Sequence, residues 1–135
     1  MSVSFEFTYA KTVVGSKNFH KLEANAYETV LRETVELPLV VMFDPRKNRF
    51  MSQSVEVGVM SNHAGFSKKM GSGSINVSQI LNSQTLVSRE QTKLEKCFDK
   101  NAVLNIKAVF EFRGTHNGND LDSPSHSKFS LSTIR

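Results

Sequence analysis

Basic side chains are the groups in this sequence whose types and spacing point most clearly to a chemical role. They recur every few positions in two connections between apolar segments. Cations at this density attract anionic surfaces, and each one near an anionic leaflet contributes about 1 kcal/mol. We therefore expect reversible, salt-sensitive binding to an anionic phospholipid surface. The candidate residues in these connections are Lys11, Lys17, Lys21, Arg46, Lys47 and Arg49.

The two connections must lie near each other for their cations to act together. If consecutive strands run antiparallel, the first and third connections leave from the same end of a sandwich. The sequence then predicts one basic cluster at that end, with Phe19 and Phe50 beside it to enter a membrane. Lys68 and Lys69 are predicted to lie at the opposite end, with Arg32.

Lys107 and Arg113 are further candidates, because they fall on the polar face of the last predicted strand. An alternative interpretation of all these cations is that they are ordinary solvated charges. Three nearby acids weaken the positive field around them. These are Glu23, Glu33 and Glu36.

Carboxylates are too scarce to predict a calcium site. Ca²⁺ takes six to eight oxygen ligands, so a calcium site needs several carboxylates that converge. Before residue 114 the only aspartates are Asp44, which lies among cations, and Asp99. Asp120 and Asp122 are able to contribute only if the end of the chain folds back. The sequence predicts no metal and no cofactor.

The remaining reactive residues do not form a catalytic set. The histidines show no metal-ligand spacing, and they are His20, His63, His116 and His126. Cys97 follows a lysine, but no histidine is assigned to it as a base, and a buried thiol is the simpler interpretation. The motif at residues 71–74 lacks the lysine of a phosphate-binding loop. We predict that the protein is not an enzyme.

Composition describes a single globular domain. The chain has 135 residues, 39% of them hydrophobic and 22% charged, with a net charge of +4. This modest charge, without a nucleic-acid-binding motif, argues against DNA or RNA as the partner. One cysteine, no membrane-spanning run and no signal peptide predict a soluble cytoplasmic protein, associated at most peripherally with a membrane or the cytoskeleton. The oligomeric state is not predicted.

Alternating apolar and polar residues identify the elements that must position these side chains. Four segments show the two-residue period of half-buried strands, and they are residues 3–9, 35–43, 55–59 and 104–112. Pro38 within the second of them implies a sheet edge or a bulge. Residues 21–32 and 74–81 are also interpreted as strands. A short helix is predicted over about 88–97, because Ser88 and Gln91 match a capping box.

The end of the chain has a different composition. Residues 114–135 are rich in serine and show no clear apolar alternation. We interpret them as a flexible tail or linker, so that the predicted folded domain is 1–113. Strands with one short helical connection in about a hundred residues predict an all-β antiparallel sandwich.

Three segments, in this order and spacing, resemble the N-terminal-type C2 domain. They are residues 35–60, 68–81 and 102–112, and together the likeness spans about 3–113. The resemblance implies an eight-stranded C2-like β-sandwich that docks on membranes or proteins, usually at the start of a larger protein. It also implies a role for Lys107, because C2-like domains bind phosphoinositide headgroups on a concave sheet face that carries lysines.

The sequence thus predicts a non-catalytic module that docks on anionic membrane lipids or on partner proteins without calcium. The alternative is a protein-binding scaffold of a cytoskeletal, ciliary or trafficking adaptor without lipid binding. In that case an exposed strand edge, or the apolar face near Pro38, makes the contact.

Overall fold

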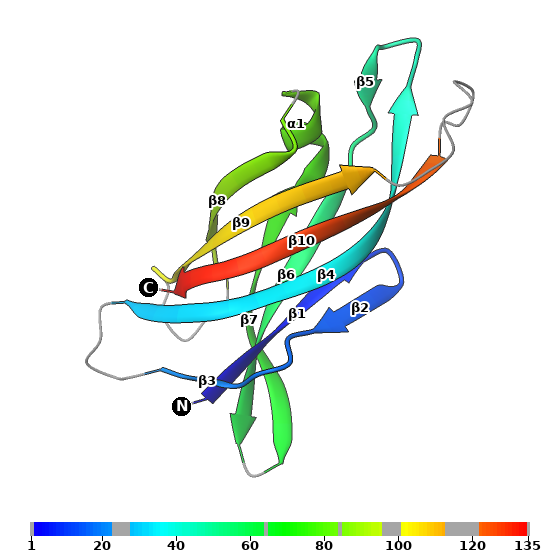
Figure 1. Ribbon diagram of the computed structural model, residues 1–135. Helices are drawn as coiled ribbons and strands as arrows, with labels where there is room; N and C mark the ends of the chain where they lie inside the picture. Colours follow the sequence, from blue (N-terminus) through cyan, green and yellow to red (C-terminus); the bar gives the residue numbers. More distant parts are fainter. Residues whose placement is uncertain are drawn as a thin grey trace.

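Two antiparallel sheets face one another and enclose the apolar core (Figure 1). The computed structural model describes residues 2–22, 28–63, 65–83, 85–95, 101–112 and 122–134. Within them it contains ten strands and one short helix. The predicted all-β sandwich is confirmed, although the strands exceed the eight that the resemblance implies.

The first sheet holds the strands from the beginning and the middle of the chain. Its order is β2-β1-β6-β7, and β3 pairs with the first residues of β1. Alternation explains β1, since Val3, Phe5 and Phe7 face inward and are fully buried. The strands are β1 (Ser2–Tyr9), β2 (Thr12–Gly15), β3 (His20–Lys21), β6 (Ser54–His63) and β7 (Phe66–Asn76).

The second sheet has the order β5-β4-β10-β9-β8. The longest strand, β4, has 16 residues, and its alternating Leu31, Val35, Leu37 and Leu39 are buried. The strands are β4 (Thr29–Asp44), β5 (Arg49–Phe50), β8 (Val87–Lys93), β9 (Val103–Phe112) and β10 (Asp122–Ile134). Lys21 ends β3 and Thr29 begins β4, so the single strand predicted over 21–32 is not present. Residues 23–27 lie outside the described part of the chain.

Pro38 lies on an edge of this sheet, as its type predicts. The Met51 N–H donates to the Met42 carbonyl at 2.8 Å, so even-numbered residues of β4 turn their backbone groups away from β10. Pro38 belongs to that set. Its missing N–H therefore removes no hydrogen bond from the β4–β10 ladder.

The two sheets meet through aromatic side chains in the core. Phe129 of β10 stacks on Phe7 of β1 with ring centroids 5.0 Å apart. The same ring meets the edge of Phe110 of β9 at 6.2 Å. All three side chains are buried, so β10 contributes to the centre of the sandwich.

The predicted tail is therefore an error. Residues 122–134 form β10, which lies between β4 and β9 and pairs with both. Phe129 and Leu131 face the core, whereas Lys128 before them and Ser132 after them are exposed. Ser127 also faces inward and is fully buried, with its hydroxyl donating to the Leu37 carbonyl at 2.9 Å, so a serine at a core position hides the two-residue alternation. The fold extends to residue 134, and residues 113–121 lie outside the described part.

The single helix, α1 (Val77–Asn82), is not where the sequence predicts one. Asn76 ends β7, and its side chain accepts a hydrogen bond from the Gln79 N–H at 3.0 Å, as an N-cap does. Ile80 and Leu81 then point into the core. Segment 74–81 is thus half strand and half helix, and the helix predicted over 88–97 is largely strand β8 instead.

The sheets are also joined along one side, at the edges of β7 and β8. The Ser72 and Glu95 backbones exchange hydrogen bonds of 3.0 and 2.7 Å. Next to them, a Cβ on Gly73 would lie 2.2 Å from the Thr92 Cγ2 atom and 3.2 Å from the Lys93 carbonyl oxygen. Only glycine fits at this approach of the two edges.

We expect Gly73→Ala to lower the free energy of unfolding by about 1 to 3 kcal/mol, because the methyl group overpacks this junction. Gly15→Ala is the matched control, since a Cβ there meets nothing closer than 3.9 Å. Urea denaturation of both variants measures the difference. Equal stability of the two variants would show that β8 moves aside without cost.

Candidate functional site

The predicted basic cluster does not form at one end of the sandwich. Lys17 and Lys21 lie at β3, which pairs with the beginning of β1. Arg46, Lys47 and Arg49 lie in the turn after β4 and in β5. Figure 1 places β3 and β5 at opposite ends of the molecule. The prediction that these cations gather is wrong.

The lengths of the connecting elements explain the separation. Lys11 follows the end of β1, whereas Lys21 pairs with Ser2 at the beginning of β1. The cations of the first connection therefore lie at opposite ends of this strand. The chain then crosses to the second sheet. There β4 runs for 16 residues, about 50 Å of extended chain, before the basic turn begins.

The structure instead places Lys21 and Lys68 at one end of the first sheet. Lys21, Ser2, Asn62 and Ser67 lie in register across β3, β1, β6 and β7, and Lys68 follows Ser67. The prediction that Lys68 lies far from Lys21 is therefore also wrong. Phe19 stays beside the cations, and its side chain is 69% exposed.

Lys107 lies where its sequence position predicts, on the outer face of the second sheet. It is exposed on β9, directly opposite Arg89 of β8 and, on its other side, Ser130 of β10. A shallow hollow of ≈ 750 Å³ opens around these strands. Its lining residues are Arg89, Glu90, Gln91, Asn105, Ile106, Lys107, Ser132 and Thr133.

The electrostatics of this pair are unusual for a folded sheet. Like charges directly opposite each other on neighbouring strands oppose folding. Within the described residues, no carboxylate lies within 4.0 Å of Arg89 or Lys107. Lys128, one row away, differs because it has Glu36 at 3.5 Å. An anion between Arg89 and Lys107 would relieve their repulsion, and the hollow offers hydroxyl and amide groups beside it.

Arg89 was missed because residues 88–97 were interpreted as a helix. Read as a strand, residues 87–93 alternate Val87, Arg89, Gln91 and Lys93 on the exposed side. That alternation is the signal in the sequence that places Arg89 on a sheet face. Its pairing with Lys107 depends on the sheet order, which no local pattern contains.

His20, one of the histidines, has a structural role. Its Nε2 atom lies 2.9 Å from Glu33 Oε2, and the Asn18 N–H donates to Glu33 Oε1 at 2.8 Å. The Glu33 side chain is 4% exposed. Burial raises the pKa of Glu33, but its hydrogen bonds with His20 and Asn18 and the charge of His20 outweigh burial, so that the pKa lies below its ordinary value.

Potential metal ligands do not converge in the described part of the chain. No group of three or more His, Cys, Asp or Glu side chains occurs there. Asp44 accepts a hydrogen bond from the Arg46 N–H at 2.9 Å within its own turn. Asp122 begins β10 opposite Met42, so the end of the chain does fold back, but two aspartates are too few for calcium. Cys97, Asp99 and Arg113 lie outside the described residues.

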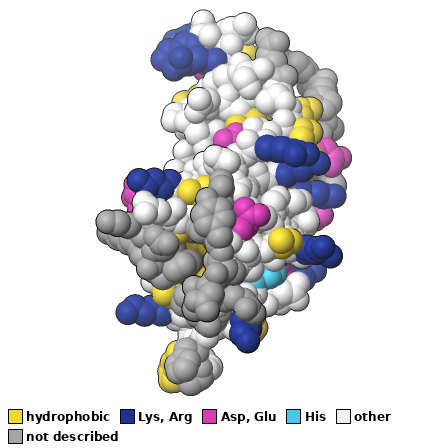
Figure 2. Space-filling view, turned by 90° about the vertical axis from the view of Figure 1, so that its left-hand side faces the viewer, with side chains coloured by type: hydrophobic (Ala, Val, Ile, Leu, Met, Phe, Trp, Pro, Cys, Tyr) yellow, Lys and Arg dark blue, Asp and Glu magenta, His cyan; other side chains and the backbone are white. Residues whose placement is uncertain are grey.

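The visible surface carries its cations in several places. Figure 2 shows Lys and Arg side chains at the upper left, at the lower left and down the right-hand side, with acidic side chains next to some of them. No helix among the described residues is long and apolar enough to cross a membrane. The chain matches no protein-family model, no curated protein and no solved structure.

Proposed function

We propose that this protein is a non-catalytic, C2-like docking module that binds anionic phospholipid headgroups without calcium. The binding surface is the outer face of the second sheet, centred on Lys107 and Arg89. The basic turn with Arg46, Lys47 and Arg49 extends from the same sheet and adds long-range attraction. Lys17 and Lys21 lie at the other end of the molecule and contribute little to this contact.

One observation carries the proposal. Arg89 and Lys107 lie opposite each other and both line a polar hollow, and no carboxylate among the described residues lies within 4.0 Å of either cation. A phosphate group supplies the missing negative charge and accepts hydrogen bonds from the guanidinium and the ammonium group together. Because both side chains are exposed, the site also meets a flat lipid surface without a conformational change.

We expect Lys107→Glu to weaken binding to vesicles of phosphatidylcholine and phosphatidylinositol bisphosphate by about thirtyfold. The reversal removes one favourable charge and adds an unfavourable one, each of about 1 kcal/mol. Co-sedimentation at low salt, with and without a calcium chelator, measures the effect. Arg89→Glu is expected to act in the same way.

Lys68→Glu is the matched control, because it changes the net charge equally on an exposed residue of the other sheet. It is expected to change vesicle binding by less than about threefold. Equal losses of vesicle binding for Lys68→Glu and Lys107→Glu would show that the overall positive charge attracts the vesicles and that Lys107 is not part of a specific site. Absence of wild-type binding at low salt, or its loss on chelation, would reject calcium-independent lipid docking.

A second candidate function, docking of a protein partner, is favoured by an open strand edge. Strand β8 pairs with β9 on one side, and no strand pairs with it along its other side in the described chain. Exposed apolar side chains near the far end of β4, namely Val40, Met42 and Met51, add a second feature typical of protein contacts.

A further inference from the structure

The backbone of β8 divides into residues that bond to β9 and residues that do not. At one end the Phe110 N–H donates to the Leu86 carbonyl at 2.8 Å, and at the other the Leu94 N–H donates to the Ala102 carbonyl at 3.0 Å. In an antiparallel pair such residues alternate along the strand. Even-numbered residues of β8 thus bond to β9. The residues that turn their N–H and C=O groups away are Val87, Arg89, Gln91 and Lys93.

Most of these outward groups have no partner in the described part of the chain. The Val87 carbonyl accepts the Thr85 hydroxyl at 2.9 Å. Glu95 is the next residue along the chain whose backbone groups face away from β9. It exchanges its two backbone hydrogen bonds with Ser72 of β7. The stretch between these two contacts is an unpaired edge. Its three residues are Arg89, Gln91 and Lys93.

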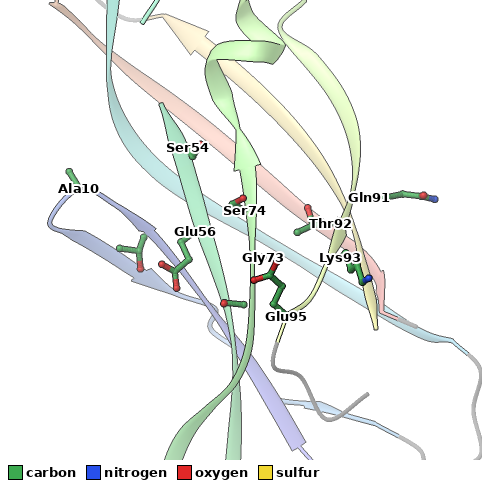
Figure 3. A pocket seen from close by; sticks show the side chains of 11 residues that line it. Ala10, Ser54, Glu56, Gly73, Ser74, Gln91, Thr92, Lys93 and Glu95 are labelled. Carbon is green, nitrogen blue, oxygen red and sulfur yellow. The ribbon is translucent and has the colours of Figure 1, made fainter. Parts of the chain in front are cut away.

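A hollow of ≈ 720 Å³ lies beside this edge (Figure 3). Ser74 and Glu56 of the first sheet line it on one side, and Thr92 and Lys93 of β8 line it on the other. The edges of β7 and β8 touch at Ser72 and Glu95, beside Gly73, and the rest of the hollow is not filled by any described residue. Because the Lys93 carbonyl lies close to Gly73 of β7, the room for an additional strand is beside Arg89 and Gln91.

The side chains along the edge define what such a strand must carry. Arg89 and Lys93 point to the outer face, and both are exposed. Glu90 points to the other side and is partly exposed, with the Ser88 hydroxyl donating to it at 2.6 Å. An antiparallel strand places its own residues opposite these, on the same face.

We propose that an extended acidic peptide adds to β8 as an extra antiparallel strand. Its residues opposite Arg89 and Lys93 are Asp or Glu, and its residue opposite Glu90 is Lys or Arg. Main-chain hydrogen bonds to Arg89 and Gln91 supply affinity, and the alternating charges supply specificity. The same charges oppose indiscriminate pairing with strands of other sequence. This recognition does not depend on lipid binding.

The probe is a synthetic peptide, acetyl-Glu-Val-Thr-Lys-Glu-Thr-Val-amide, whose first residue lies opposite Lys93 and whose fifth lies opposite Arg89. Amide hydrogen exchange followed by NMR gives a readout for each residue. The peptide is expected to slow exchange at Arg89 and Gln91 by about tenfold or more at saturation. Ser88, Glu90 and Thr92 are already bonded to β9 and should change much less.

Two control peptides separate the contributions. The charge-reversed peptide, acetyl-Lys-Val-Thr-Glu-Lys-Thr-Val-amide, is expected to bind at least about tenfold more weakly, because both outer positions then repel. A peptide with N-methyl groups on its third and fifth residues keeps every side chain but loses two backbone donors. It should also bind about tenfold more weakly, and this result does not depend on any protein variant.

The protein variant Gln91→Pro removes one outward N–H and leaves the β8–β9 ladder intact. It is expected to weaken peptide binding by about tenfold, whereas Gln91→Ala stays within about twofold. Vesicle binding is tested separately by Lys107→Glu, so failure of one proposal does not imply failure of the other. The inference is overturned if the N-methylated or the charge-reversed peptide binds as tightly as the probe, or if the exchange pattern does not follow odd-numbered residues.

Discussion

A chain that ends at residue 113 is expected not to fold. Strand β10 lies between β4 and β9, so its removal leaves the second sheet as two unconnected pairs of strands. It also removes Phe129, Leu131 and Ile134 from the core. Burial of side chains of this size contributes about 1.5 to 3 kcal/mol each, which together is comparable to the whole stability of a small domain.

The point variant Phe129→Ala tests the same feature in the full chain. Its ring stacks on Phe7 and meets Phe110, and it is fully buried. We expect the free energy of unfolding to fall by about 3 to 5 kcal/mol, from lost burial and from the cavity that remains. Ser132→Ala, on the exposed side of the same strand, should change stability by less than about 0.5 kcal/mol.

Circular dichroism and urea denaturation of the three proteins provide the measurement. The truncated chain should show no cooperative transition, and Phe129→Ala a transition at lower urea with an unchanged slope. A cooperative, wild-type-like transition of the truncated chain would restore the flexible-tail interpretation. It would also mean that β10 adds to a preformed fold.

The strands that the sequence revealed are those in which every second residue is apolar over a continuous run. β1, β4, β6 and β9 were each predicted from their two-residue alternation. β4 begins earlier than predicted, at Thr29, because Glu33 interrupts its apolar face. Alternation is a local property of the chain, so it is visible without the fold.

The elements that were missed have local sequence patterns that fit more than one type of secondary structure. The stretch from Asn76 to Gln79 is an asparagine cap followed three residues later by Gln, which is the capping pattern of α1. The similar pattern of Ser88 and Gln91 was taken for a helix start, but these residues alternate in β8. Serine spacing alone does not decide between a tail and β10, because the core that β10 completes comes from distant strands.

The site was predicted only in part, for a related reason. Lys107 falls on an outer face because its neighbours alternate, and this is local. Its opposition to Arg89 depends on the order of β8 and β9 in the sheet. The predicted grouping of Lys21 with Arg46 required a regular succession of strands, and the two-residue β3 breaks that succession.

Glu33 is the residue whose role differs most from its sequence interpretation, and its replacement is the second large effect that we expect. The sequence suggests a surface acid, but Glu33 points inward from β4 and binds both His20 and the Asn18 N–H. Glu33→Ala leaves these two groups without their acceptor. We expect a loss of about 2 to 3 kcal/mol, because hydrogen-bonding groups are left without a partner in a largely buried position.

Glu36→Ala is the matched control for Glu33→Ala. Glu36 lies on the outer face of the same strand, and its contact with Lys128 at 3.5 Å is exposed. Exposed pairs contribute less than about 1 kcal/mol, so this variant should unfold close to wild type in urea. Equal effects of the two substitutions would contradict the role of Glu33 as an internal anchor of the segment before β4.

The pH dependence of stability provides an independent test of the same anchor. Because the folded-state pKa of Glu33 lies below its unfolded-state value, the ionised carboxylate favours the folded protein. That contribution is complete above the unfolded-state pKa and disappears as the pH falls through the folded-state pKa. From pH ~6 to pH ~2, wild type should therefore lose more stability than Glu33→Gln, which has no carboxyl group to protonate at this position. If the free energy of unfolding fell equally with pH for the two proteins, the ionised carboxylate would not favour the folded state. The hydrogen bonds at residue 33 would then stabilise the fold equally well without a charge.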